Sequence, residues 1–334
     1  NALYIQYADA HVCVGPAEAL ESYLNIPSII SAAEITDIEA IHPGYGFLSE
    51  DSHFAEVCES SNIVFIGPPS GVMVKMGDKT QARKIASENK VPIIPGSESA
   101  LKSQQHALDV AHELGYPVLL KASFGGGGRG MRVAHNDISL VNSFAIAKRE
   151  AEIAFKDSSI YMEKYVEHSR HIEVQIVADN YGNMVHLGER DCSIQRRNQK
   201  LLEEAPSPNI SNQLREEICK AALKIAKAVK YASVGTVEFL VDKNGKFYFI
   251  EMNTRLQVEH PVTEMVTGID LVKEQLKIAC GERLGLRQKK VKWEGVSIEC
   301  RINAEDPDND FRPSIGKISM CNPPGGLGVR VDSH

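Results

Sequence analysis

The sequence predicts a protein of mixed α/β and α+β architecture, and three observations support this prediction. Short apolar runs alternate with helical patterns over residues 1–67, which is typical of a parallel sheet. A glycine-rich loop lies between two expected strands near residue 125, and Asn244-Gly245 joins two apolar strands further on. With 334 residues, 43% of them hydrophobic, the chain is long enough for two or three packed domains.

Composition and charge exclude several functions. The net charge of −7, from 37 basic and 44 acidic residues, argues against a nucleic-acid partner, whose binding needs surplus Lys and Arg. No apolar run approaches the roughly 18–20 residues that cross a bilayer, so we expect no membrane insertion. Seven cysteines without a CxxC spacing favour free thiols in a reducing compartment. We therefore expect a cytoplasmic protein, or a plastid or mitochondrial-matrix protein in a eukaryote.

The expected elements follow one another in a regular order. The first unit should contain strands at 10–14, 38–42 and 62–66 and a helix at 52–61. After Gly67-Pro-Pro-Ser70, a helix should run from 79 to 89, because the carboxylate of Asp78 can accept hydrogen bonds from its first N–H groups. Residues 94–165 form a compact α+β module. Its expected elements are helices near 103–114 and 137–154 and strands near 117–121, 131–134 and 159–163.

The remaining chain is rich in strands. Ile172, Val174 and Ile176 alternate with polar residues, which predicts a strand with one apolar and one polar face. A long amphipathic helix is expected near 211–230.

The most informative segment is the hairpin around Asn244-Gly245. If these residues form a two-residue turn, counting outward along both strands places Glu238 directly opposite Glu251. The opposite, apolar face would carry Val237, Phe239, Val241, Tyr248, Ile250 and Met252. Like charges opposite each other destabilise a sheet, so a divalent cation with oxygen ligands is the natural compensation.

The same alternation continues beyond the hairpin if the chain stays extended. It adds Asn253, Arg255, Gln257 and Glu259 to the polar face. A pair of carboxylates with an Asn suits Mg²⁺, or Mn²⁺, shared with substrate phosphates. The alternative is a solvated hairpin face with a surface glutamate pair, which so apolar an opposite face disfavours.

The glycine-rich loop follows Lys121 directly. Its glycines are Gly125, Gly126, Gly127, Gly128 and Gly130. They leave the backbone open to an approaching phosphate. The loop is neither a Walker A loop nor a dinucleotide fingerprint, because no Gly-Lys-Ser/Thr closes it and no helix follows. A flap over phosphates fits better than a linker, with Lys121 as a point charge at its base.

Six motifs lie in order across the chain. They are His42-Pro-Gly-Tyr-Gly-Phe-Leu-Ser-Glu50, Met76-Gly-Asp-Lys79, Tyr116–Met131, Glu189–Lys200, Phe249–Pro261 and Glu299–Asp306. In these motifs the chain resembles the biotin carboxylase component of biotin-dependent carboxylases, a member of the ATP-grasp superfamily. The resemblance implies an ATP-dependent ligase that forms a C–N bond. Mg-ATP and bicarbonate would give carboxyphosphate, and biotin on a carrier protein would then be carboxylated at its ureido nitrogen.

The resemblance also implies a domain order. An ATP-grasp fold would be preceded by a parallel-sheet N-terminal domain of the biotin carboxylase type, of which residues 1–67 are the remainder. Residues 68–93 would be a helical linker, 94–165 the lid domain with its glycine flap, and 166–334 the catalytic domain. The family's domain begins before Asn1 and ends after His334, so we expect a chain truncated at both ends.

Single residues receive roles from the resemblance. Those expected to hold ATP are Lys79, Lys121, Gly125, Gly126, Gly127, Gly128, Glu163, Lys164, Val166, His171 and Gln195. Glu238 and Glu251 would be the metal ligands with Asn253 beside them, which matches the opposed pair derived above. Those expected around bicarbonate are Lys200, Arg255, Gln257 and Val258, and Glu259 would deprotonate it. Tyr45 and Gly46 would belong to the biotin pocket, and Arg301 would stabilise the enolate-like oxygen of biotin.

The implied partners are a biotin carboxyl carrier protein, a carboxyltransferase and a second copy of the chain. Acetyl-CoA is the expected final acceptor, as in the first half-reaction of acetyl-CoA carboxylase in fatty acid synthesis. Two alternatives stay open. One is another carboxyphosphate-forming ATP-grasp enzyme, such as half of a carbamoyl-phosphate synthetase, which the motifs at 42–50 and 255–260 disfavour. The other is a nucleotide-binding remnant that acts only as an assembly subunit.

Overall fold

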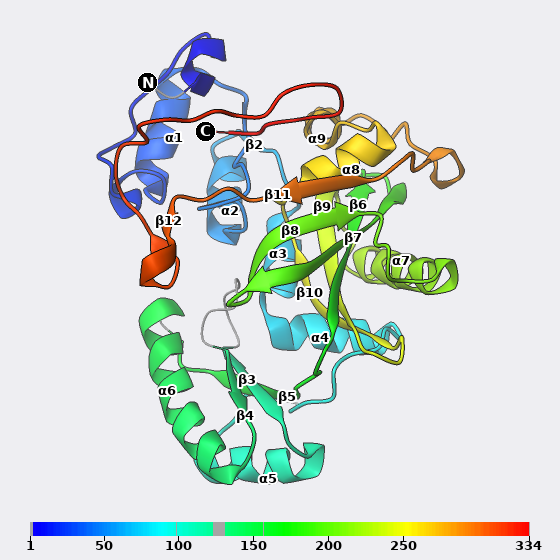
Figure 1. Ribbon diagram of the computed structural model, residues 1–334. Helices are drawn as coiled ribbons and strands as arrows, with labels where there is room; N and C mark the ends of the chain where they lie inside the picture. Colours follow the sequence, from blue (N-terminus) through cyan, green and yellow to red (C-terminus); the bar gives the residue numbers. More distant parts are fainter. Residues whose placement is uncertain (1–2, 98, 123–130, 156, 334) are drawn as a thin grey trace. The chain divides into compact units, whose positions relative to one another are not determined.

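The computed structural model describes residues 3–97, 99–122, 131–155 and 157–333 and divides into two units (Figure 1). The larger unit is Asp37–Cys300, and the smaller joins Asn1–Thr36 to Arg301–His334. The expected mixture of α/β and α+β elements is confirmed. All seven cysteines are free, as expected. Over the described ranges, no helix combines the length and the apolarity needed to cross a bilayer.

The smaller unit has little regular structure. It contains α1 (Ile26–Ile35), short 3-10 turns at Leu3–Tyr7, Ala19–Glu21 and Pro307–Asn309, and the strand pair β12 (Glu305–Asp306) and β13 (Arg312–Pro313). The strand expected at 10–14 is wrong. These residues are mostly exposed and pair with no strand in the described part of the chain, and a strand needs a partner for its N–H and C=O groups.

The larger unit begins with a parallel pair, β1 (Ala40–Ile41) and β2 (Val64–Phe65), connected through α2 (Ser52–Ser60). This confirms the expected strand–helix–strand order with shorter strands. The helix α4 (Lys79–Glu88) is capped as predicted, because the Asp78 carboxylate accepts hydrogen bonds from the N–H groups of Thr80 and Gln81. An additional helix, α3 (Ser70–Gly77), was not expected from the proline-rich segment, in which Pro69 occupies its N-cap.

The α+β module is a three-stranded sheet of order β4-β3-β5 with two helices against it. Its elements are α5 (Gln104–Leu114), β3 (Val118–Ala122), β4 (Arg132–Ala134), α6 (Asp137–Phe155) and β5 (Ile160–Lys164), all within a residue or two of expectation. A strand rather than a helix follows the glycine loop, as predicted. Gly125 to Gly128 themselves lie outside the described residues.

A six-stranded antiparallel sheet of order β10-β9-β6-β7-β8-β11 forms the rest of the larger unit (Figure 1). Its strands are β6 (Arg170–Ala178), β7 (Met184–Arg196), β8 (Gln199–Ala205), β9 (Ser233–Val241), β10 (Phe247–Asn253) and β11 (Ser297–Cys300). The helices are α7 (Asn212–Ala228), α8 (His260–Thr267) and α9 (Leu271–Ala279), with a 3-10 turn at Gln288–Lys290.

Alternation along the strands separates the two faces of this sheet. Ile172, Val174 and Ile176 of β6 pack with α3, α4 and α7 in one apolar cluster. Val177, of opposite parity, packs instead with α9 in a second cluster. His171, Glu173 and Gln175 share the parity of Val177, so the polar residues of β6 lie on the α9 face, as the alternation predicts.

The hairpin pairs Glu238 with Glu251 as predicted, but by a different route. The loop has three residues rather than two, because Asp242 pairs with Lys246 and Gly245 takes a positive φ of 79°. A β-bulge between Phe249 and Glu251 then shifts the register by one residue and restores the pairing. For the same reason Phe249, rather than Tyr248 or Ile250, is the buried core residue, so that part of the predicted apolar face is wrong.

Candidate active site

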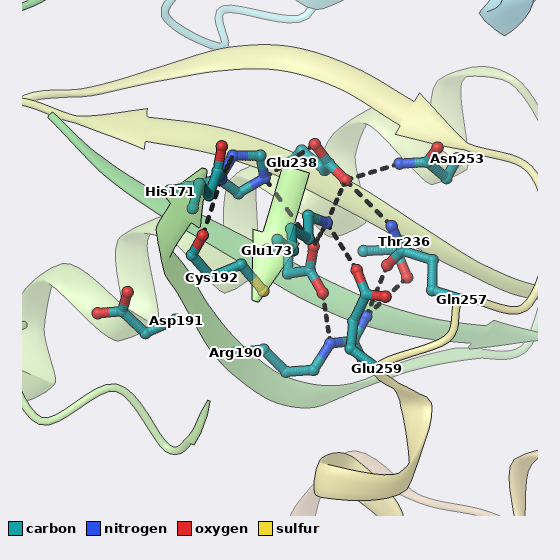
Figure 2. Close-up of polar contacts among 12 residues, drawn as sticks. His171, Glu173, Arg190, Asp191, Cys192, Thr236, Glu238, Asn253, Gln257 and Glu259 are labelled. Atoms are coloured by element: carbon teal, nitrogen blue, oxygen red, sulfur yellow. Dashed lines mark hydrogen bonds and ion pairs between the residues drawn. The ribbon is translucent and has the colours of Figure 1, made fainter. Parts of the chain in front are cut away.

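Three carboxylates and an arginine occupy neighbouring positions across the polar face of the sheet, and Figure 2 shows three of these four residues, Glu173, Glu238 and Arg190. The register places Glu251 of β10 opposite Glu238 of β9, Glu238 opposite Glu173 of β6, and Glu173 opposite Arg190 of β7. Glu173 and Glu238 are 0% and 4% exposed. Because Glu238 is buried and the side chain of Glu251 is 23% exposed, the alternative of a solvated Glu238–Glu251 pair is excluded, and the buried charges need partners within the protein.

Arg190 is fully buried and uses all five of its N–H groups. Nε donates to Glu173 at 2.5 Å, and the four remaining donors reach Gln175 (2.7 Å), Thr263 (2.9 Å), Thr236 (3.1 Å) and Gln257 (2.8 Å). The guanidinium thus connects three strands to the start of α8. It fixes the carboxylate of Glu173 and the amide oxygen of Gln257 in place.

Lys200, on β8, is the cation at the centre of the site. Its ammonium group lies 2.5 Å from Glu173, 2.9 Å from Glu238 and 2.6 Å from Glu259, so three N–H donors meet three carboxylates. Burial alone would lower the pKa of Lys200, but the carboxylates of Glu173 and Glu238 outweigh it and raise this pKa well above its ordinary value. Lys200 is therefore a permanent positive charge here.

Glu238 accepts hydrogen bonds from three side chains and forms an ion pair with a fourth. Oε1 accepts from Lys200, from Asn253 (2.8 Å) and from Gln257 (3.0 Å), and Oε2 lies 2.8 Å from Nε2 of His171. Burial would raise the pKa of Glu238, but the charges of Lys200 and His171 hold it well below its ordinary value. Burial would likewise lower the pKa of His171, yet Glu238 raises it. The side-chain amide nitrogen of Gln195 lies 3.2 Å from Nδ1 of this ring.

Gln257, Val258 and Glu259 reach the site through a turn and not through an extended strand. The strand β10 ends at Asn253, so the expected extended run through Glu259 is wrong. The N–H of His260 closes the turn onto the carbonyl of Gln257 at 3.2 Å, and α8 starts there. Gln257 and Glu259 are nevertheless 3% and 2% exposed and point into the cluster (Figure 2).

Arg255 is held by the segment that ends the first motif. Its Nε donates to Glu50 at 2.8 Å, and the other carboxylate oxygen of Glu50 accepts from the N–H of Thr254 at 2.8 Å. The guanidinium also donates to the carbonyl of Leu256 and to Asn253, both at 3.2 Å. Burial would lower the pKa of Arg255, but Glu50 outweighs it and keeps the group charged.

The two lysines expected at the phosphates each face a glutamate. Nζ of Lys79 lies 3.2 Å from Glu251, and Nζ of Lys121 lies 2.5 Å from Glu163. Glu163 also pairs closely with Arg83 of α4, and Lys121 and Arg83 both approach the ring of Tyr161. Glu163 is 1% exposed, its side chain anchors Lys121, and its backbone lies within the sheet opposite Leu119 of β3.

The segment of Glu163, Lys164 and Val166, which the resemblance places at ATP, is partly engaged within the module. The N–H of Lys164 donates to the carbonyl of Pro95 at 2.8 Å, and its ammonium group donates to the carbonyls of Gly115 and Tyr116. Val166 lies two residues after the end of β5 and is of intermediate exposure. These contacts fix the end of β5, from which the chain continues to β6.

The residues expected at biotin lie in the turn-rich segment 42–50. Tyr45 is 50% exposed, and a Cβ placed on Gly46 would meet nothing within 4 Å, so the surface there is open. Arg301 is the first residue of the C-terminal part of the smaller unit, and its role stays a prediction.

The donor set fits a hard divalent cation such as Mg²⁺. Glu238 and Glu251 offer carboxylate oxygens from adjacent strands, with Asn253 next to them. Among the described residues, two sets of potential ligand residues have ligand atoms within 4.8 Å of one another, His171 with Glu173 and Glu238, and Glu173 with Cys192 and Glu259; Glu238 belongs to the first set and Glu251 to neither. Both expected ligands are paired with cations, so a metal ion would have to replace Lys79 beside Glu251.

Several site residues were not singled out from the sequence. Glu173 shares the parity of His171 on β6, which is the signal that could have identified it. Arg190 lies within the motif Glu189–Lys200, but no local pattern indicates that it is the buried centre of a network. Glu50 and Arg83 act across 80 or more residues of sequence, beyond the range of any local pattern.

Comparisons with known proteins agree with this geometry. The family described as "Biotin carboxylase, N-terminal domain" matches residues 1–73, and "Biotin carboxylase C-terminal domain" matches residues 299–334. Between them, "Carbamoyl-phosphate synthase L chain, ATP binding domain" matches residues 78–287. The chain is 57% identical to the biotin carboxylase of Nostoc sp. and 55% identical to biotin carboxylase 1 of Bacillus subtilis. These matches cover the whole chain and 75% and 74% of the relatives.

Solved structures give the same result. The biotin carboxylase β,γ-ATP complex from Campylobacter jejuni is 53% identical, with a TM-score of 0.96 over 98% of this chain and 73% of that one. The biotin carboxylase domain dimer of Hydrogenobacter thermophilus 2-oxoglutarate carboxylase, in complex with MgADP, ADP and bicarbonate, is 50% identical. Its TM-score is 0.94, over 98% of this chain and 72% of that one.

Fold and comparisons together define an ATP-grasp protein, that is, an ATP-dependent ligase. More specifically, the chain belongs to the biotin carboxylase family. Both flanking domains and the relatives are biotin carboxylases, which disfavours the carbamoyl-phosphate synthetase alternative.

Proposed function

We propose that this chain uses ATP and bicarbonate to carboxylate biotin on a carrier protein through carboxyphosphate. The observation that carries the proposal is the ion pair of Lys200 with Glu259 at 2.6 Å. Lys200 also contacts Glu238, which is opposite Glu251, and Arg255 lies four residues before Glu259 in the same segment. The charged ammonium group of Lys200 and the guanidinium of Arg255 can bind a small anion, and the buried carboxylate of Glu259 can accept a proton from it.

Lys79 and Lys121 are the groups proposed to bind the phosphates. Each is held by one carboxylate, Glu251 or Glu163, so each ammonium is oriented before nucleotide arrives. When nucleotide binds, its phosphate oxygens would replace these carboxylates as partners of the two ammonium groups, because the phosphates carry more negative charge than a single carboxylate. His171 and Gln195 would contact the ribose, and the glycines 125–128 and the hinge around Glu163, Lys164 and Val166 would close over the nucleotide.

Glu238 and Glu251, with Asn253, would hold Mg²⁺, which when bound neutralises phosphate charge and so favours attack at phosphorus. The chain's own contribution is to keep Glu238 ionised, since Lys200 and His171 hold its pKa low.

Glu259 is the proposed base for bicarbonate. It is 2% exposed, and its contact with Lys200 favours the carboxylate form needed to accept a proton. Arg255, Gln257 and the backbone of Val258 would orient the anion so that one oxygen attacks the γ-phosphorus of ATP and ADP leaves. The C–O bond of carboxyphosphate then breaks as its carboxyl group bonds to the ureido nitrogen of biotin, which Tyr45, Gly46 and Arg301 would hold, and the leaving phosphate takes up the N–H proton of that nitrogen.

The finer assignments are also part of this proposal. The final acceptor would be acetyl-CoA, in fatty acid synthesis, with a carboxyltransferase as partner and a homodimer as the working state. Relatives named simply biotin carboxylase, in bacteria and in chloroplasts, support this, whereas structural neighbours from pyruvate and 2-oxoglutarate carboxylases make the acceptor the point to test. The domain boundaries at 67, 93 and 165 and a cytoplasmic or organellar location remain predictions.

The deciding experiment measures ATP hydrolysis with and without bicarbonate, and with and without free biotin. We expect phosphate release to depend on bicarbonate and to rise with biotin. ATP turnover unaffected by either would refute the proposal and favour a nucleotide-binding remnant. Transfer from the carboxylated carrier to acetyl-CoA, propionyl-CoA, methylcrotonoyl-CoA or pyruvate would identify the acceptor.

Two sets of variants test the roles. Glu259→Gln should abolish bicarbonate-dependent turnover while leaving nucleotide binding intact, and full activity would show that another group is the base. Glu238→Ala and Glu251→Ala should raise the Mg²⁺ concentration needed for half-maximal turnover. Glu216→Ala is the control, because Glu216 lies at the surface and its ion-pair partner in the described part of the chain is Lys220. Unchanged magnesium dependence in both would refute the metal assignment.

A further inference from the structure

The segment 42–50 is tied at both ends to distant parts of the larger unit. At its start, Nε2 of His42 lies 3.1 Å from Oε1 of Gln275 on α9. Nδ1 of the same ring accepts a hydrogen bond from the N–H of Gly44 at 3.0 Å, so the proton is on Nε2 and Gln275 is the acceptor. Between the two ties lie Tyr45 and Gly46.

The second tie is made by both carboxylate oxygens of Glu50. Oε1 accepts from the N–H of Thr254 at 2.8 Å and from its hydroxyl at 3.2 Å, and Oε2 accepts from Nε of Arg255 at 2.8 Å. Glu50 directly precedes Asp51, whose carboxylate caps α2 by accepting from the N–H of Phe54 at 2.7 Å. The backbone that carries Glu50 is therefore fixed by a helix start.

These bonds leave Arg255 with one defined orientation. Nε is engaged by Glu50, and one N–H of each terminal nitrogen reaches Leu256 or Asn253. Of the five N–H groups, two therefore find no acceptor within the described ranges. One lies on each terminal nitrogen, a pair suited to a small anion.

Stability alone does not account for the Glu50–Arg255 pair. The two side chains are 38% and 22% exposed, and ion pairs at such exposure contribute little to folding free energy. Because the Glu50–Arg255 contact adds little stability but fixes the orientation of the Arg255 guanidinium, we expect its main effect to be on the ligand that Arg255 binds.

We propose that Glu50 is a positioning residue for bicarbonate: it orients Arg255 and couples that arginine to the segment that carries Tyr45 and Gly46. This inference rests on the proposed function, because it assumes that Arg255 contacts bicarbonate. It adds a residue that acts through Arg255 and touches no substrate itself.

Glu50→Gln is the decisive variant because it keeps the shape and removes one acceptor. The amide oxygen can accept from Thr254 or from Arg255, but not from both, and the NH₂ group then faces another donor. We expect KM for bicarbonate to rise about tenfold, the scale of a lost charge-assisted hydrogen bond, while KM for ATP and the melting temperature stay unchanged. Glu50→Asp, which keeps the charge one methylene shorter, should give an intermediate KM.

Glu56→Gln is the matched control, since Glu56 is an exposed carboxylate on the adjacent helix α2 and should leave both KM values unchanged. In an Arg255→Lys background, which lacks Nε, Glu50→Gln should change KM for bicarbonate less than about twofold. If both Glu50 variants had the wild-type KM for bicarbonate, the inference would be wrong while the proposed function would stand. The same holds if KM for ATP rose as much as KM for bicarbonate. Wild-type protein whose ATP hydrolysis ignores bicarbonate would instead overturn the proposed function, and the inference with it.

Discussion

Replacing Arg190 with Met should destabilise the larger unit strongly. Arg190 is 0% exposed and is the partner of Glu173, which is equally buried. Removing one member of a buried ion pair typically costs about 3–5 kcal/mol, because the other charge stays buried. Glu173 retains Lys200 at 2.5 Å, so we expect the lower end, about 3 kcal/mol.

The measurement is urea unfolding followed by circular dichroism, with Arg132→Met as the matched control. Arg132 pairs with Glu150 at 2.5 Å, but their side chains are 35% and 43% exposed, so its loss should cost no more than about 1 kcal/mol. A loss below about 1 kcal/mol for Arg190→Met, equal to that of the control, would refute the reading of Arg190 as the centre of a buried network.

Three further predictions follow from local contacts. The pKa of His171 is raised above its ordinary 6.5, because Glu238 outweighs the effect of burial, so its ion pair stabilises the fold at low pH. The free-energy difference between wild type and His171→Gln should therefore be largest below pH 6.5 and shrink as the pH rises through the folded-state pKa, and a difference independent of pH would contradict this. Gly245→Ala should cost about 1–2 kcal/mol in urea unfolding because φ is 79° there, although an added Cβ meets nothing within 4 Å; no loss would mean that the loop relaxes. Iodoacetamide at pH 8 should modify the four exposed cysteines well before Cys58, whose pKa burial raises to about 11, and equal labelling of Cys58 would contradict its burial.

The buried charges of the site are better explained by function than by stability. Glu173, Glu238 and Glu259 surround one lysine, and replacing such groups with apolar residues is often neutral or stabilising for a fold. Their arrangement is costly to bury, but it fixes charged groups where an incoming anion would need them. This matches the general tendency of strongly perturbed titratable groups to lie at functional sites.

Much of the fold was predictable because its signals are local. The Asp78 cap, the alternation along β6 and the position of a strand after the glycine loop all depend on neighbours within a few residues. The hairpin prediction illustrates the limit. It placed Glu238 opposite Glu251 correctly, although the loop has one more residue than expected and a bulge near Ile250 compensates for it. Local pattern gives the pairing, whereas the bulge depends on how β10 packs against the core.

The sequence by itself determined the family, the paired carboxylates and the basic residues proposed to meet phosphate and bicarbonate, since each lies in a motif or follows from strand alternation. Only the tertiary structure decided that Arg190 holds Gln257, 67 residues away, and that Glu50 holds Arg255, 205 residues away. The physical reason is the strand order β10-β9-β6-β7-β8-β11, which brings together residues that no local pattern connects. Periodicity specifies which face a side chain occupies, but sheet order and the chain's return after β10 specify which partners it meets there.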